Sequence, residues 1–257
     1  MACAGRNKHL PLQVKKRKRN MSRILVLAKS GFGKTFSIGQ IPDLNHIGLN
    51  PEETYVISVT SKPLTFPKSR ELYKVTEVSA MQNGNRVITN NPEQVAYAIE
   101  QLLQSPFKNI VVDDFNYLMQ DYYMDNALKG GWDTPKKIGY FMGKIFAAIE
   151  KYGDSDKNII VLAHGEEVPQ QDGRVYLKMK TTGKMVDEYV TPEGKFDVTL
   201  VGRSRFDAGT KKIVKEFITN EDEFTASPKS PYGMFEELYI PNDLGYVVAK
   251  VNAYYNG

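Results

Sequence analysis

Short, unbroken apolar runs recur along the first two thirds of the chain, and each is followed by a polar, turn-rich or amphipathic segment. Strands that are buried on both faces of a sheet read as continuous apolar runs rather than as alternating ones. Strands that alternate with helices predict a mainly parallel sheet with helices on both faces. The predicted strands lie at residues 23–28, 55–60, 86–89, 109–114 and 158–164.

The segments between these strands predict helices. Residues 90–104 carry a clear helix start, because Asn91 can cap the free N–H groups and Pro92 suits the first turn. Two further segments repeat apolar residues with helical periodicity, and another helix is expected directly after the first strand. These helices are predicted at residues 115–128, 134–152 and 33–42.

The pattern changes after residue 165. Residues 170–180, 195–206 and 211–219 predict hairpin-forming, antiparallel strands that extend the sheet, and residues 242–255 predict a closing helix. We therefore expect an α/β fold with one domain over residues 22–257. Its parallel-sheet core covers residues 22–165, and its antiparallel extension with the C-terminal helix covers residues 166–257.

Composition narrows the class of protein. Of the 257 residues, 41% are hydrophobic and 25% are charged, which is typical of a globular domain, and no apolar stretch approaches the ~20 residues of a membrane span. The single cysteine, Cys3, excludes an internal disulfide and suits a cytoplasmic protein. The net charge of +4 is concentrated at residues 15–19, so residues 1–21 are expected to be a disordered basic tail, a nucleic-acid arm or a localisation signal.

The first strand runs into a phosphate-loop pattern, "AKSGFGKT". In G-x-x-x-x-G-K-[ST] the backbone N–H groups cradle phosphates, the lysine reaches the β- and γ-phosphates, and the hydroxyl ligates Mg²⁺. Only the first glycine is replaced, by Ala28, where the chain leaves the strand. The sequence therefore predicts an ATP site whose contacts are Ser30, Gly31, Phe32, Gly33, Lys34 and Thr35.

Two acids end the fourth predicted strand. A phosphate loop needs an acid at the end of a neighbouring strand to hold Mg²⁺, and Asp113 is our candidate, together with Thr35. Asp114 occupies the place where many ATPases have a water-activating glutamate, but aspartate is one methylene shorter. Glu166 and Glu167, after the fifth strand, are alternative bases, because the end of the second strand ("SVTSKPL") has no acid.

His164 ends the fifth predicted strand, beside the expected phosphate site. A polar residue at this edge can sense the γ-phosphate and transmit its loss. A lone histidine is equally well a structural residue, and both interpretations stay open.

Basic residues gather on the later strands. Arg203 and Arg205 share one face of an alternating strand, and Lys229 lies between two Ser-Pro turns. These residues are either a solvated face, contacts to nucleic-acid phosphates, or fingers that reach the ATP of a neighbouring subunit.

The phosphate loop, the strands "NIVVDDFNYLM" and "NIIVLAHGEE", and the segment "KFDVTLVGRSRF…FTASPKSPYGMF" together resemble the phage RecA-like ATPases with single-strand annealing activity. The resemblance covers about residues 22–244. It implies a RecA-like core that binds ATP and Mg²⁺, contacts single-stranded DNA and assembles into a ring or filament. It also implies roles for Lys34, Thr35 and Asp113, a sensor role for His164, and a between-subunit role for Lys229.

The sequence leaves three functions open. The first is a DNA-dependent ATPase of phage recombination or replication. The second is an assembly or packaging component that binds ATP with little turnover, because the water-activating acid is uncertain. The third is a small-molecule kinase, which the absence of an arginine-rich lid disfavours.

Overall fold

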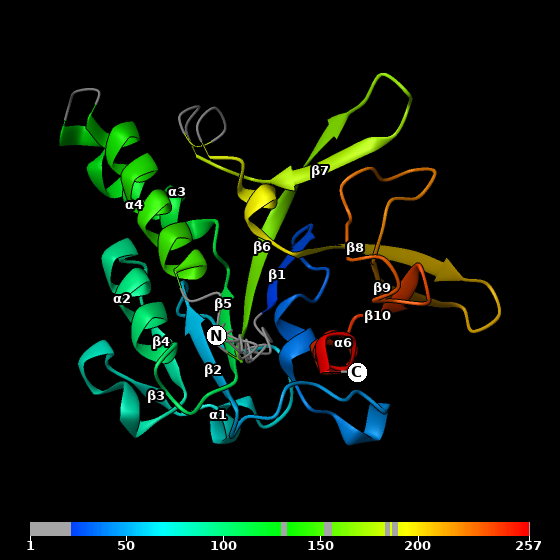
Figure 1. Ribbon diagram of the computed structural model, residues 1–257, viewed down its shortest axis with the longest axis horizontal. Helices are drawn as coiled ribbons and strands as arrows, with labels where there is room; N and C mark the ends of the chain where they lie inside the picture. The colour runs from blue at the N-terminus through cyan, green and yellow to red at the C-terminus, as the bar shows by residue number, and fades with distance from the viewer. Residues whose placement is uncertain (1–21, 130–132, 152–155, 183–185, 187–189, 257) are drawn as a thin grey trace, which may run out of the picture.

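The computed structural model describes residues 22–129, 133–151, 156–182, 186 and 190–256. Its centre is one large, mainly parallel sheet that carries helices on both faces (Figure 1). The predicted fold class is therefore confirmed. The predicted basic tail, residues 1–21, lies outside the described residues.

The sheet has the strand order β10-β9-β8-β1-β6-β5-β2-β4-β3, and β7 pairs with β6 off this path. The strands from β1 to β6 and the first half of β8 pair in parallel, whereas β7, β9 and β10 pair antiparallel. Their bounds are β1 Ser22–Ala28, β2 Thr54–Ser58, β3 Val75–Thr76, β4 Arg86–Ile88, β5 Asn109–Asp113, β6 Asn158–Pro169, β7 Val175–Met179, β8 Val198–Asp207, β9 Lys212–Ile218 and β10 Tyr239–Pro241.

Two apolar layers cover the sheet. Residues that alternate along each central strand belong to different clusters, so that Leu25 and Leu27 pack with α2 and α4 whereas Ile24 and Val26 pack with α6. None of the helices among the described residues is long and apolar enough to cross a membrane. The α-helices are α1 Ser69–Leu72, α2 Pro92–Leu102, α3 Tyr117–Asn126, α4 Asp133–Glu150 and α6 Leu244–Asn256. The 3₁₀ helices are η1 Thr35–Ile38, η2 Pro42–Leu44, η3 Val78–Asn83, η4 Ala127–Lys129 and η5 Pro192–Lys195.

The predicted helix over residues 33–42 is wrong in length and type, because only the single 3₁₀ turn η1 forms there. Instead, the backbone around Gly48 lies in close contact with the backbone at Gly39 and at Gly245. A Cβ on Gly48 would lie 2.2 Å from the Gly39 carbonyl oxygen, and one on Gly245 would lie 2.0 Å from the Gly48 carbonyl oxygen. The C-terminal helix α6, which begins beside Gly48, covers this face of the sheet.

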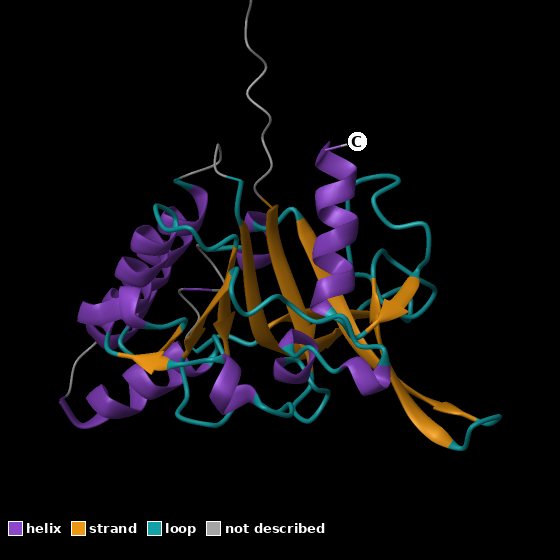
Figure 2. Cartoon of the chain, turned by 90° about the horizontal axis from the view of Figure 1, so that it is seen from below, coloured by secondary structure: helices purple, strands orange, loops and turns teal. Residues whose placement is uncertain are grey.

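Two strands differ from the prediction, β6 in its length and β8 in its pairing. β6 continues through residues 165–169 and pairs antiparallel with β7. β8 starts in parallel with β1 and only from Val201 onward pairs antiparallel with β9, so the extension is not wholly antiparallel. The β8–β9 hairpin projects beyond the body of the molecule, at the lower right of Figure 2.

Candidate functional site

The phosphate loop lies between β1 and η1, at the carboxyl end of the parallel strands. Gly31 has φ +78° and Gly33 has φ +103°, which are left-handed values that favour glycine. Successive N–H groups in such turns form concavities that bind anions. The loop therefore has the backbone that its sequence predicts.

Ala28 is explained by its neighbour on β8. Ala28 is fully buried, and a Cβ built on Gly202 would lie only 2.7 Å from the Ala28 methyl group. The missing methyl at Gly202 therefore leaves room for the methyl at Ala28. The same Cβ would lie 2.6 Å from the ring of Phe32, which packs against Phe217 at 5.8 Å between ring centroids.

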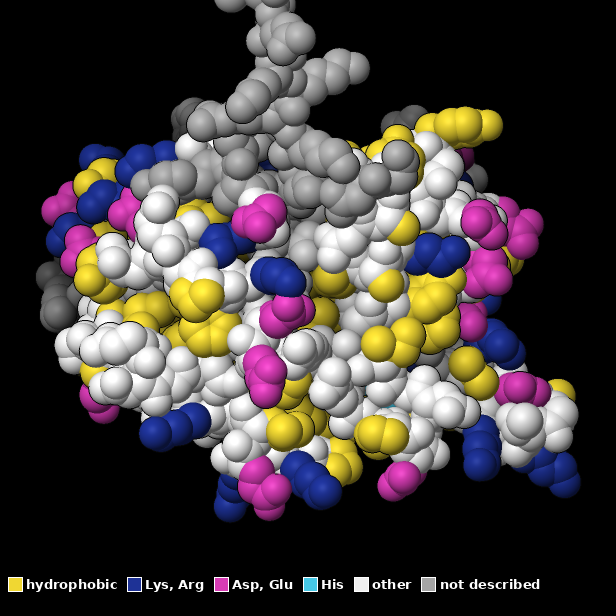
Figure 3. Space-filling view, turned by 60° about the horizontal axis from the view of Figure 1, so that its bottom comes forward, with side chains coloured by type: hydrophobic (Ala, Val, Ile, Leu, Met, Phe, Trp, Pro, Cys, Tyr) yellow, Lys and Arg dark blue, Asp and Glu magenta, His cyan; other side chains and the backbone are white. Residues whose placement is uncertain are grey.

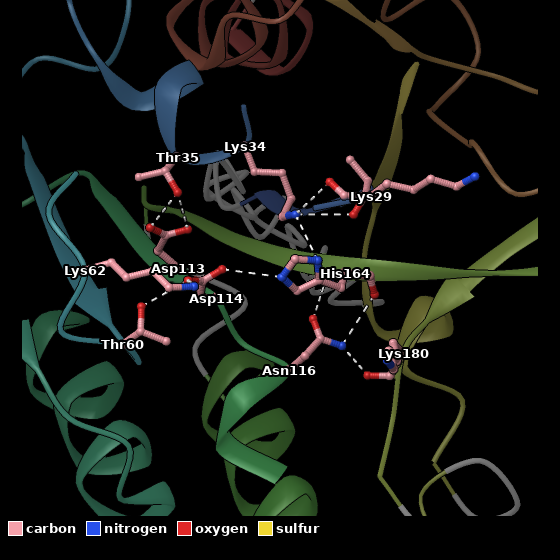
Figure 4. A network of polar contacts seen from close by, with 11 residues as sticks. Lys29, Lys34, Thr35, Thr60, Lys62, Asp113, Asp114, Asn116, His164 and Lys180 are labelled. Atoms are coloured by element: carbon pink, nitrogen blue, oxygen red, sulfur yellow. Dashed lines mark hydrogen bonds and ion pairs between the residues drawn. The ribbon is translucent and has the colours of Figure 1, made fainter. Parts of the chain in front are cut away.

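The lysine of the loop is buried and points across the strand ends. Lys34 Nζ donates to the Ala28 carbonyl at 3.2 Å and to the Lys29 carbonyl at 3.4 Å, and it lies 3.4 Å from His164 Nδ1 (Figure 4). Burial lowers the pKa of Lys34, while Asp114 and Asp113 oppose that change. A buried cation at this position favours an anionic ligand.

Thr35 and Asp113 meet across 78 positions of sequence. The Thr35 hydroxyl lies 3.1 Å from Oδ1 and 3.0 Å from Oδ2 of Asp113. Burial, reinforced by the charge of Asp114, raises the pKa of Asp113 to about 6. A hydroxyl and a carboxylate are oxygen ligands of the kind that Mg²⁺ prefers, so this pair fits the predicted metal position.

Asp114 is held in an uncommon backbone conformation, with φ +63°. Its carboxylate accepts from the Thr60 hydroxyl at 3.0 Å and lies 3.8 Å from Lys62 Nζ and 3.7 Å from His164 Nε2. Burial acts to raise the pKa of Asp114, but the contacts with His164, Thr60 and Lys62 outweigh it and lower the pKa. The group is therefore a carboxylate at neutral pH.

His164 lies between the two charges of the site, with Lys34 on one side and Asp114 on the other (Figure 4). Nδ1 can accept from the Lys34 ammonium only when the proton is on Nε2, which faces Asp114. The imidazole therefore connects the phosphate-loop lysine with the acid after β5. This placement fits the predicted sensor position.

Comparisons with known proteins add little to this geometry. No model of a known protein family matches the chain, and no curated protein matches it. Among the solved structures that match, a KaiC-like protein from the hyperthermophilic archaeon Pyrococcus horikoshii has a TM-score of 0.42 and 13% sequence identity, over 77% of this chain and 77% of that chain. A likeness at this level carries no argument about family or function, so both are argued from the site.

A cavity of about 690 Å³ follows the phosphate loop. Its lining includes the polar group Lys34, Lys62, Asp114 and His164, which contact one another. The lining also includes the apolar residues Phe36, Ile213 and Pro241, together with His46 and Asn242. The cavity therefore offers cations and N–H groups to a phosphate chain, and apolar surface to an attached aromatic base.

Other predicted site residues lie away from this cavity. Glu166 faces Lys178 across the β6–β7 hairpin, and Glu167 pairs with Lys29 at 2.7 Å. Neither glutamate lines the cavity, and among the described residues Asp114 is the acid that does. Glu167 therefore reaches the phosphate loop at Lys29 and lines a neighbouring cavity with Ser30 and Gly31, but neither glutamate lies beside Lys34.

The predicted basic residues are also outside the cavity. Arg203 and Arg205 both pair with Glu216, at 2.6 Å and 3.1 Å, and Arg203 stacks 3.6 Å from the centroid of the Tyr239 ring. Lys229 is exposed, and its backbone bonds to Thr199 in the middle of the sheet. None of these three residues lines the cavity that contains Lys34, although Arg203 lines a neighbouring cavity together with Ser30 and Gly31.

Sequence reasoning missed three residues of the site. Thr60 and Lys62 follow β2 and contact Asp114, but no role was predicted at this strand end because it has no acid. Asn116 is buried, accepts a hydrogen bond from the His164 backbone N–H and donates to the Lys180 carbonyl. The sequence signal for Asn116 was its polar side chain two positions after Asp114. Its partners, His164 and Lys180, are distant in the sequence, so no local pattern showed these contacts.

Proposed function

We propose that the chain binds Mg²⁺·ATP and is a RecA-like P-loop ATPase. The observation that carries this proposal is the meeting of Thr35 with Asp113 beside buried Lys34, in a cavity that the phosphate loop lines. Two segments that are far apart in the sequence supply these groups, the phosphate loop with the start of η1 and the end of β5. Each group has the chemistry that a nucleoside triphosphate with its metal requires.

Hydrolysis would use the chain's own groups as follows. The loop N–H groups and Lys34 bind the phosphate chain, and Thr35 with Asp113 would hold Mg²⁺, which neutralises phosphate charge when bound. Asp114 accepts a proton from water, whose oxygen attacks the γ-phosphorus while the bond to ADP breaks. Because its pKa is lowered, Asp114 is a weak base, and we expect slow turnover.

Single-stranded DNA is the proposed partner. The resemblance to single-strand annealing ATPases supports it, as do exposed cations at the tip of the β8–β9 hairpin, Lys211 and Lys212. Lysine and arginine side chains gather on the projection at the right of Figure 3. Cations on a projecting hairpin can reach a phosphate backbone without disturbing the nucleotide site.

Assembly into a homo-oligomer is the second partner proposal, as a ring or a filament. In a ring or filament, exposed Lys229 is the residue available to a neighbouring subunit's nucleotide. The two arginines of β8 are less available, because Glu216 pairs with both of them.

A second candidate function is a component that binds ATP with little turnover. The observation in its favour is the set of contacts that hold Asp114 and lower its pKa. In that case nucleotide binding would order an assembly, as in a packaging or structural role.

The deciding experiment measures ATP hydrolysis with and without single-stranded DNA, together with the native mass. Strong stimulation by DNA is expected from the first function. ATP binding with no turnover, even with DNA, would reject it and support the second. Lys34→Ala serves as the control, and full ATP affinity in that variant would contradict both.

A further inference from the structure

Lys215 on β9 lies directly over the phosphate loop of its own chain. Its Nζ donates to the Gly31 carbonyl at 2.7 Å and lies 3.8 Å from the point where a Cβ on Gly33 would stand. Lys215 lines the same cavity as Lys34 and Thr35. The ammonium group therefore stands beside the two left-handed glycines that shape the anion concavity.

The alternation of β9 explains this position. Phe217 is fully buried in the apolar cluster that contains Phe32, and Ile218 belongs to the cluster on the opposite face. Lys215 is two residues from Phe217 and shares its face, whereas Glu216 faces the other way and pairs with the arginines of β8. The hairpin thus separates its cations, and Lys215 is the one on the nucleotide side.

The cations of the cavity differ in whether an acid of the site already faces them. Lys62 lies 3.8 Å from Asp114, and the acids of the site also act on Lys34. Within the part of the chain that the structure describes, Lys215 has no ion pair, and its recorded partner is a neutral carbonyl. A cation in this condition gains more from an added anion than one that already faces a carboxylate.

We propose that Lys215 binds the phosphate chain of the nucleotide in the same subunit, so that β9 completes the site that the phosphate loop begins. The proposal rests on the proposed ATP site. It differs from a finger that acts between subunits, because the residue and the loop belong to one chain. It also separates Lys215 from the exposed lysines near the hairpin tip.

Nucleotide binding by Lys215→Ala tests this assignment. A lost hydrogen bond to a charged group weakens affinity on the order of tenfold or more, so we expect this loss for ATP and ADP. Adenosine binding should be unchanged, because adenosine has no phosphate. Lys215→Arg should retain most of the affinity, and Lys136→Ala, at an exposed position of α4, is the matched control.

The melting temperature without nucleotide separates binding from structure. Lys215 is exposed, so the melting temperature of Lys215→Ala should equal that of the unchanged protein. An equal loss for adenosine and ATP, or a marked fall in melting temperature, would assign Lys215 a structural role and overturn the proposal. If the unchanged protein itself fails to bind ATP, the proposed function fails instead, and the two outcomes are distinguishable.

Mixed assemblies decide which subunit Lys215 serves. Lys215→Ala subunits are combined with Lys34→Ala subunits, and ATP binding is measured on the mixture. If Lys215 acts within its own chain, every site keeps one defect and no binding is restored. Restored binding would show that the lysine is delivered between subunits and would contradict the proposal.

Discussion

At the scale of single residues, adjacent acids have opposite electrostatic environments. Asp113 is buried with its pKa raised to about 6, whereas contacts with His164, Thr60 and Lys62 lower the pKa of Asp114. A raised pKa means that the folded protein resists the charged form, and a lowered pKa means that it favours the charged form. The two carboxylates therefore affect stability with opposite signs.

Replacing each acid by its amide tests this difference. In buffer with a chelator at neutral pH, Asp113→Asn is expected to raise the free energy of unfolding by on the order of 1–3 kcal/mol. Asp114→Asn is expected to lower it, because a favourable charge is lost. Thermal or urea unfolding measures both, and destabilisation by Asp113→Asn would contradict the assignment.

The pH dependence follows from the same directions. The folded-state pKa of Asp113 lies above its unfolded value, so its destabilisation is absent below about pH 4 and develops as the pH rises to about 6. The contribution of Asp114 has the opposite sign and is lost on acidification. Asp113→Asn should also abolish Mg²⁺-dependent hydrolysis, so greater stability and lost activity are expected in one variant.

At the scale of elements, β8 supports the phosphate loop through the absence of a side chain. A Cβ at position 202 would clash with Ala28 and Phe32, so only glycine fits there. Overpacking a close contact of this kind costs about 1–3 kcal/mol. Gly202→Ala is therefore expected to destabilise the fold and, by moving Phe32, to weaken ATP binding.

Gly143→Ala is the matched control for that substitution. Gly143 is an exposed position of α4 with no heavy atom within 4 Å of a built Cβ. Alanine at a helix position of this kind is expected to stabilise by about 0.5–1 kcal/mol and to leave ATP affinity unchanged. The free energy of unfolding and the ATP affinity are measured for both variants. Equal changes in Gly202→Ala and Gly143→Ala would refute the packing argument.

The elements also show how far the sequence predicts the structure. The buried strands and the Asn91 cap of α2 follow from local patterns, and Asn91 accepts from Glu93 and Gln94 as expected. The helix predicted after the phosphate loop does not form. The closing helix α6 was predicted over residues 242–255, but its packing on this face joins distant parts of the chain and has no local sequence pattern. Asp113 was predicted from its strand end, whereas Thr60, Asn116 and Lys215 depend on pairings between distant strands.

At the scale of the whole molecule, a nearly continuous parallel sheet carries projecting hairpins. Lys211 and Lys212 are exposed near the tip of one of them. If this hairpin contacts single-stranded DNA, replacing both lysines by alanine should weaken binding and reduce the dependence of log affinity on log salt by roughly 1–2. ATP affinity should remain unchanged.

Two lysines of α4 provide the control for the hairpin variant. Lys136 and Lys137 are exposed, and replacing both removes the same charge from another surface. DNA titrations over a range of salt concentrations compare the two double variants. Equal weakening would show that only net charge matters and would reject the hairpin as the DNA contact.

One strand, β6, belongs both to the parallel core of the sheet and to a projecting hairpin. β6 runs without a break from the core, past His164, into the hairpin with β7. Gly165 and Pro169 are about 13 Å apart at the rise of a strand. A tilt of about 10° at Gly165 would move Pro169 by about 2 Å over that length. A movement at the phosphate-binding edge would therefore be transmitted along β6 to the exposed end of the β6–β7 hairpin.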